Sequence, residues 1–144
     1  MPLTAAIEVP AGQTDPRHLE VKLRIANPAG GKIAVHNPDM GVAAPAMNWS
    51  FSQEMYQTSM LISFGYLSIS VTDEAGNELP QQAIQTWATP VLQPKLELGP
   101  GDSFEVAIPI GDLYQLAPAH AYWVTLTYGD QDLKVSAGTR LVAP

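Results

Sequence analysis

The chain has 144 residues, which suits a single domain spanning residues 1–144, and its 14 acidic against 7 basic residues give a formal net charge of −7 at pH 7. A charge of this sign repels the phosphate backbone of nucleic acids, so we expect no nucleic-acid partner. The absence of cysteine excludes disulfides and thiol chemistry, and 13 prolines with 11 glycines favour short strands joined by turns.

The first ten residues contain neither a basic segment nor an apolar run typical of a secretory signal. No stretch approaches the roughly 18 apolar residues of a membrane span. We therefore expect a soluble, cytoplasmic protein with no membrane span. A periplasmic or secreted location is expected instead if a leader was removed and a new Met1 put in its place.

The first clear strand is predicted at residues 18–27, where apolar residues alternate with mostly polar ones. Its apolar positions are Leu19, Val21, Leu23 and Ile25. A turn rich in proline and glycine follows at 27–31, and the alternation resumes at Ile33 and Val35. The simplest arrangement is a hairpin between these two strands.

Between about residues 37 and 64 the alternation is lost. A seven-stranded sandwich needs only about 100 residues, so most of the extra length falls in this insertion, and long irregular connections often carry function. Methionine and aromatic side chains suit contacts with proteins. We predict a partner-binding site formed by Met47, Trp49, Phe51, Met55 and Tyr56. The alternative is that these side chains fold back into a small satellite core.

Leu67, Ile69 and Val71 mark the next strand, which an acidic turn at residues 73–80 closes. A calcium loop of the EF-hand type beginning at Asp73 would need an oxygen ligand and a glutamate where Ala75 and Ile84 stand. The segment is therefore interpreted as a turn with a glycine in the left-handed conformation. Residues 81–91 fit either a short helix or an irregular edge.

From Lys95 to Val142 the pattern predicts consecutive antiparallel strands. A short strand at 96–98 and a turn at 99–102 precede a strand whose apolar face is formed by Phe104, Val106, Ile108 and Ile110. Pro109 marks the end of that strand. A strand over 122–128, a tight turn at 129–132 and a last strand reaching Leu141 complete the chain.

The stretch Leu116-x-Pro118-x-x-x-Tyr122-x-Val124 resembles the corner of fibronectin type III and related immunoglobulin-like domains. The run from Leu98 to Tyr128 also resembles bacterial and secreted-protease-associated immunoglobulin-like accessory modules. The resemblance implies an all-β, antiparallel, immunoglobulin-like β-sandwich of about seven to nine strands of the Greek-key type. It also implies a structural corner of Leu116, Pro118 and Tyr122, in which the Tyr122 hydroxyl bonds to upstream backbone.

The titratable residues give no clear catalytic or metal motif. His18, His36 and His120 lack the spacing of a zinc site, and His36 with Asp39 is the closest pair of histidine and carboxylate outside the first strand. Four loop aspartates would bind calcium if they gathered, but solvated turn residues are the favoured interpretation. These aspartates are Asp102, Asp112, Asp130 and Asp132. We expect no catalytic residue, metal ligand or cofactor.

The leading functional prediction is a non-catalytic binding module that engages a protein partner, such as an inhibitor, an immunity-type protein or an accessory of the envelope or of secretion. The alternative is a carbohydrate-binding accessory module that uses Trp49, Trp87 or Trp123 as a stacking platform. A hydrolytic enzyme using His36 and Asp39 is the third hypothesis, because a sandwich can host many chemistries. Strand order and oligomeric state are left open.

Overall fold

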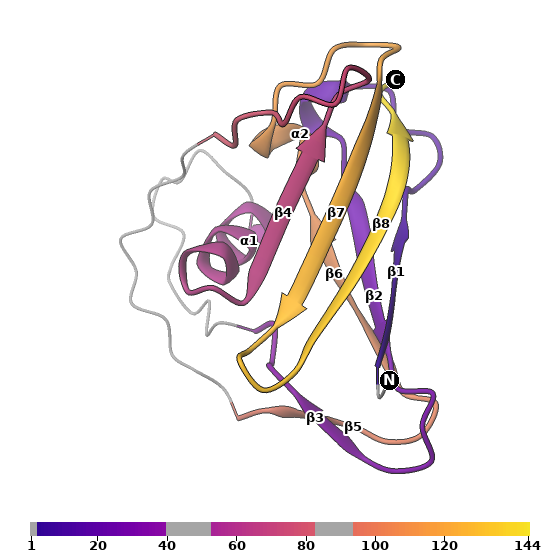
Figure 1. Ribbon diagram of the computed structural model, residues 1–144, viewed down its shortest axis with the longest axis vertical. Coiled ribbons are helices and arrows are strands. Elements are labelled where there is room, and N and C mark those ends of the chain that lie inside the picture. Colours follow the sequence, from indigo (N-terminus) through magenta and orange to yellow (C-terminus); the bar gives the residue numbers. More distant parts are fainter. Residues whose placement is uncertain (1–2, 40–52, 83–93) are drawn as a thin grey trace.

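The computed structural model describes residues 3–39, 53–82 and 94–144 (Figure 1). Within these ranges the chain is mostly β, with antiparallel pairing throughout, so the all-β class predicted from the sequence is confirmed. The strands are β1 (Thr4–Glu8), β2 (Val21–Ala26), β3 (Ile33–Val35), β4 (Leu67–Thr72), β5 (Leu96–Leu98), β6 (Ser103–Ile108), β7 (Ala121–Gly129) and β8 (Lys134–Val142). The helical elements are the 3-10 turn η1 (Pro16–His18) and the helices α1 (Gln53–Ser63) and α2 (Ile110–Leu113).

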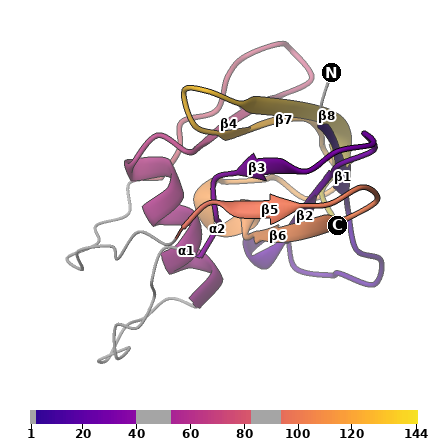
Figure 2. The ribbon, with the colours of Figure 1, turned by 90° about the horizontal axis from the view of Figure 1, so that it is seen from below.

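Two three-stranded sheets lie face to face and enclose the core (Figures 1 and 2). One sheet has the order β1-β2-β6 and the other the order β4-β7-β8. The period-two patterns explain this packing, because the apolar positions of each strand fall on the inner face. The buried residues on the inner faces of the two central strands are Val21, Leu23 and Ile25 in β2, and Tyr122, Val124, Leu126 and Tyr128 in β7.

The predicted hairpin between residues 18–27 and 33–35 is wrong. β2 pairs with β1 and β6, whereas β3 pairs with β5 in a separate two-stranded ribbon. Asn27 explains the separation, because its side-chain amide donates to the carbonyls of Gly31 (2.7 Å) and Leu98 (2.8 Å). These bonds hold the chain after β2 against the turn between β5 and β6, so it cannot fold back along β2.

The strands after Lys95 are consecutive in the chain, but only β7 and β8 pair with each other. β5 pairs with β3 and β6 pairs with β2, so both depend on partners from the N-terminal half. The predicted left-handed glycine of the acidic turn is confirmed, since Gly76 has a φ of 85°. Asp73 holds this turn by accepting bonds from the backbone N–H groups of Ala75 and Asn77.

Helix α1 closes one side of the sandwich. It lies beside β4 and β6, the two strands that end their sheets on that side within the described residues, and it contacts both (Figures 1 and 2). Met60 and Leu61 are fully buried, and Met55, Thr58 and Ser59 are also buried. The C-terminal part of the predicted insertion is therefore a wall of the main core.

Ile110 does not continue β6 as the alternation predicted. Pro109 has no N–H to donate, so the ladder ends at Ile108 and α2 begins. A side chain at position 111 would overlap the carbonyl of Pro16. Because Gly111 has none, the backbones of α2 and η1 pack directly against each other. No helix within the described ranges is long and apolar enough to span a membrane.

Candidate binding surface

The predicted partner-binding residues divide between described and undescribed parts of the chain. Met47, Trp49 and Phe51 lie outside the described residues. Met55 and Tyr56 belong to α1, and Met55 is only 8% exposed, so it packs in the core. Phe64, just after α1, is 51% exposed and was not singled out from the sequence.

The predicted corner has the geometry of a structural element. Leu116 and Tyr122 are buried, whereas Pro118 is exposed. The backbone N–H of Ala117 donates to the Tyr122 hydroxyl at 2.8 Å, which fixes the chain just before β7. The Tyr122 hydroxyl is therefore engaged by the backbone of the same corner.

His36 is packed against aromatic rings, and Asp39 lies in a turn. The ring of His36 is buried and stacks on the ring of Tyr66, with centroids 3.5 Å apart. The backbone carbonyl of His36 accepts a 2.6 Å bond from the Tyr128 hydroxyl. Burial lowers the pKa of His36 below its ordinary value, which favours the neutral ring. The backbone N–H of Asp39 donates to the side chain of Asn37 in a turn.

The structure pairs the other two histidines with carboxylates that the sequence did not suggest. His18 Nδ1 lies 3.0 Å from Asp112 Oδ1, and His120 Nδ1 lies 3.4 Å from Glu74 Oε1. Both histidines are exposed, and polar contacts at the surface contribute little to stability. His18 and Asp112 are 94 residues apart and meet because η1 packs on α2, so no local pattern could have found them.

The four loop aspartates, interpreted from the sequence as solvated turn residues with calcium binding as the alternative, are not brought together as a calcium site. Asp130 and Asp132 share Lys95, whose Nζ lies 3.2 and 3.7 Å from their carboxylates, while Asp102 caps its own turn by accepting from Gly99 N–H. Burial acts to raise the pKa of Asp130, but the bonds from Lys95 and the backbone outweigh it and leave the pKa below its ordinary value. Among the described residues, no three His, Asp or Glu side chains are placed to hold a metal ion.

The outer side of the β4-β7-β8 sheet carries an unusual set of side chains, which we call the hydroxyl face. Its positions follow from the pairing register as three rows across β4, β7 and β8. The rows are Thr72, Trp123 and Arg140; Ser70, Thr125 and Gly138; and Ser68, Thr127 and Ser136. Six of these nine residues bear a hydroxyl group, and Arg140 is the charged residue among them.

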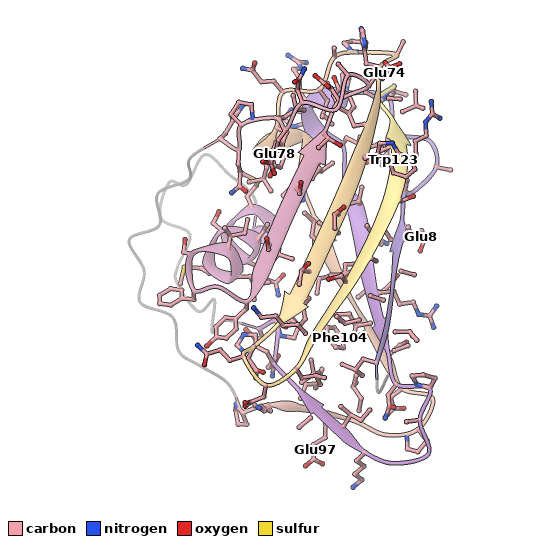
Figure 3. All side chains as sticks on the ribbon, in the orientation of Figure 1. Glu8, Glu74, Glu78, Glu97, Phe104 and Trp123 are labelled. Carbon is pink, nitrogen blue, oxygen red and sulfur yellow. The ribbon has the colours of Figure 1, made fainter. Side chains whose placement is uncertain are left out.

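Trp123 is the outlier on the hydroxyl face. It is 57% exposed and lies on the side of β7 opposite the buried Tyr122 and Val124 (Figure 3). Two hydrogen bonds lie farther along the sheet: the Thr127 and Ser136 hydroxyls are 2.8 Å apart, and the Ser70 hydroxyl donates to the Glu78 carboxylate at 3.0 Å. The face thus combines one exposed indole with a field of hydrogen-bonding groups.

The outer side of the β1-β2-β6 sheet is different. There Lys22 stands opposite Glu8, and Arg24 stands opposite Glu105, so cations and anions face each other across the strands. The large exposed hydrophobic residues of the described chain are Val9, Phe64, Trp123 and Val142, and none belongs to this sheet. Mixed charge without exposed aromatics is typical of a solvated surface, which leaves the hydroxyl face as the better candidate for binding.

Comparison with protein-family models finds no match for this chain, and comparison with curated protein sequences finds none either.

Proposed function

We propose that this chain is a non-catalytic, immunoglobulin-like module that binds carbohydrate through the hydroxyl face, with Trp123 as the stacking platform. The observation that carries the proposal is a 57% exposed tryptophan in register between Thr72 and Arg140, on a face otherwise made of hydroxyl-bearing residues and glycine.

The strand order supports the immunoglobulin-like part of the proposal. An immunoglobulin sandwich places its strands A, B and E in one sheet and C, F and G in the other. β1, β2 and β6 correspond to the first set, and β4, β7 and β8 to the second. The bond from Ala117 to the Tyr122 hydroxyl at the start of β7 corresponds to the tyrosine corner before strand F. β5 occupies the position of strand D in the chain but pairs with β3.

The chemistry of the hydroxyl face favours a sugar over a protein. Serine is depleted in protein interfaces, and serine and threonine are under-represented among the residues that dominate binding energy. Hydroxyl groups both donate and accept, which matches the hydroxyl groups of a sugar. An indole offers a flat apolar surface on which the C–H face of a sugar ring stacks.

Nuclear magnetic resonance tests the proposal directly, because the chain has three tryptophans and each indole N–H gives its own signal. The Trp123→Phe variant identifies the Trp123 signal by its disappearance. Titration with soluble oligosaccharides is expected to shift that signal, and Trp123→Ala is expected to lose binding. Phe64→Ala, an exposed aromatic elsewhere, serves as the matched control and retains binding. Unchanged Trp123 signals across neutral and acidic oligosaccharides would remove the proposal.

A protein partner, of the inhibitor, immunity or envelope-accessory kind, is the second candidate function. The observation in its favour is Phe64, which is 51% exposed and lines a cavity of about 450 Å³ together with Tyr66. Chemical cross-linking in the source cells distinguishes the two surfaces. A partner at this site loses its cross-link in Phe64→Ala and keeps it in Trp123→Ala, and the reverse result assigns the partner to the hydroxyl face.

A further inference from the structure

We infer that the hydroxyl face selects acidic carbohydrate, with a uronate ring stacked on Trp123 and its carboxylate paired with Arg140. This inference rests on the proposed function, because it names the ligand class of the same surface.

Arg140 is placed to contact a ligand bound at Trp123. Arg140 of β8 stands directly opposite Trp123 of β7, and side chains at such positions have Cβ atoms about 4.5–5.5 Å apart. A sugar ring lying on the indole therefore has its edge within reach of the guanidinium. A carboxylate at that edge accepts two parallel N–H bonds from arginine, which a neutral CH₂OH group cannot do.

The charge of Arg140 is not neutralised by a partner on the hydroxyl face. The chain carries a net charge of −7, yet none of the nine positions of the hydroxyl face is acidic. None of the ion pairs formed within the described residues uses Arg140, whereas Arg17 and Lys95 each have carboxylate partners. Arg140 is exposed and its charge remains available to an anionic ligand.

Two carboxylates of the acidic turn after β4 lie near the Trp123 end of this sheet, and both are already engaged. Glu74 accepts a 3.2 Å bond from Ala121 N–H at the start of β7 and lies 3.4 Å from His120. Glu78 accepts from the Ser70 hydroxyl and forms a β-bridge with Thr72, so it stands at the edge of the row that contains Trp123 and Arg140. Both carboxylates would weaken the field of Arg140 at long range, so the inference depends on direct contact between Arg140 and the ligand.

Arg24 provides the matched comparison within the molecule. It is exposed on β2 of the other sheet, stands opposite Glu105, and donates to the Ser103 hydroxyl at 3.3 Å. Arg24→Gln and Arg140→Gln change the net charge equally, but only Arg140→Gln removes charge beside Trp123. Any difference in ligand affinity between the two variants therefore reflects where the arginine lies and not the net charge of the protein.

The test measures, by calorimetry at low salt, the affinity of the protein for two pairs of sugar tetramers (tetrasaccharides). Glucuronate is compared with glucose in β-1,4 linkage, and galacturonate with galactose in α-1,4 linkage. We expect at least one acidic tetramer to bind about five-fold or more tightly than its neutral counterpart. Arg140→Gln is expected to abolish that preference, Arg140→Lys to keep part of it because one charge remains without the planar fork, and Arg24→Gln to keep all of it.

The outcomes separate this inference from the proposed function. Equal binding of acidic and neutral tetramers that still depends on Trp123 overturns the acidic preference and leaves carbohydrate binding intact. Equal losses in Arg140→Gln and Arg24→Gln also overturn it, because they indicate attraction by net charge alone. Absence of binding by all four tetramers counts against both. Dispersed amide spectra of each variant verify that the fold is retained.

Discussion

At the scale of single residues, His36 shows how burial sets the charge of a group. Its folded-state pKa lies below the ordinary value of 6.5, so the unfolded chain binds its proton first as the pH falls. The contribution of the neutral, buried ring to stability is therefore present above about pH 6.5 and is lost as the pH decreases towards the folded-state pKa.

We expect the free energy of unfolding of the wild type to fall more steeply between about pH 7 and pH 5 than that of His36→Phe. Phenylalanine keeps an aromatic ring against Tyr66 and removes the titrating group. Urea unfolding at several pH values measures both slopes. The difference in slope carries the test, since the substitution also changes stability at every pH. Parallel slopes would show that His36 does not titrate differently in the two states.

The same scale shows which contacts a sequence reveals. The Tyr122 contact spans five residues, and the spacing of Leu116, Pro118 and Tyr122 suggested it. The contact between His18 and Asp112 spans 94 residues and depends on how η1 meets α2, which local spacing does not encode. For Trp123 the prediction was partial. The alternation of β7 predicted that its side chain lies on the opposite side of the strand from Tyr122, but it did not predict whether that side is buried or exposed.

At the scale of elements, the alternating patterns identified strands but not their partners. β2, β4 and β6 have the predicted apolar residues on their inner faces, and β7 and β8 lie where strands were predicted. Helix α1 escaped detection because its buried side includes Thr58 and Ser59, which break the apolar period. The Ser59 hydroxyl is satisfied locally by donating to the Met55 carbonyl at 2.7 Å.

Met60→Ala is expected to destabilise the protein by about 2–5 kcal/mol, because a fully buried side chain would leave a cavity between α1 and the sheets. Phe64→Ala, one turn later and half exposed, should change stability by about 0.5 kcal/mol or less. Denaturant unfolding monitored by circular dichroism compares the two variants. Similar small losses would mean that α1 does not form part of the core.

At the scale of the whole molecule, stability is expected to be uneven. β2 and β7 each have hydrogen-bonded neighbours on both sides, whereas β3 and β5 form a short ribbon at one end of the sandwich (Figure 1). We expect amides of β2 and β7 to exchange with deuterium about 100-fold or more slowly than those of β3 and β5. Mass spectrometry of peptic fragments gives these rates. Equal protection of the ribbon would show that it unfolds only with the rest.

The closure of the sandwich by α1 has a consequence for the fate of the protein under stress. α1 lies over the side on which β4 and β6 have no neighbouring strand within the described residues, apart from the short bridge between Thr72 and Glu78 at the end of β4. Loosening of this one helix would uncover two sheet edges at once, and bare edges recruit strands from other molecules. Aggregation of this protein should therefore begin with detachment of α1, before the two sheets themselves come apart.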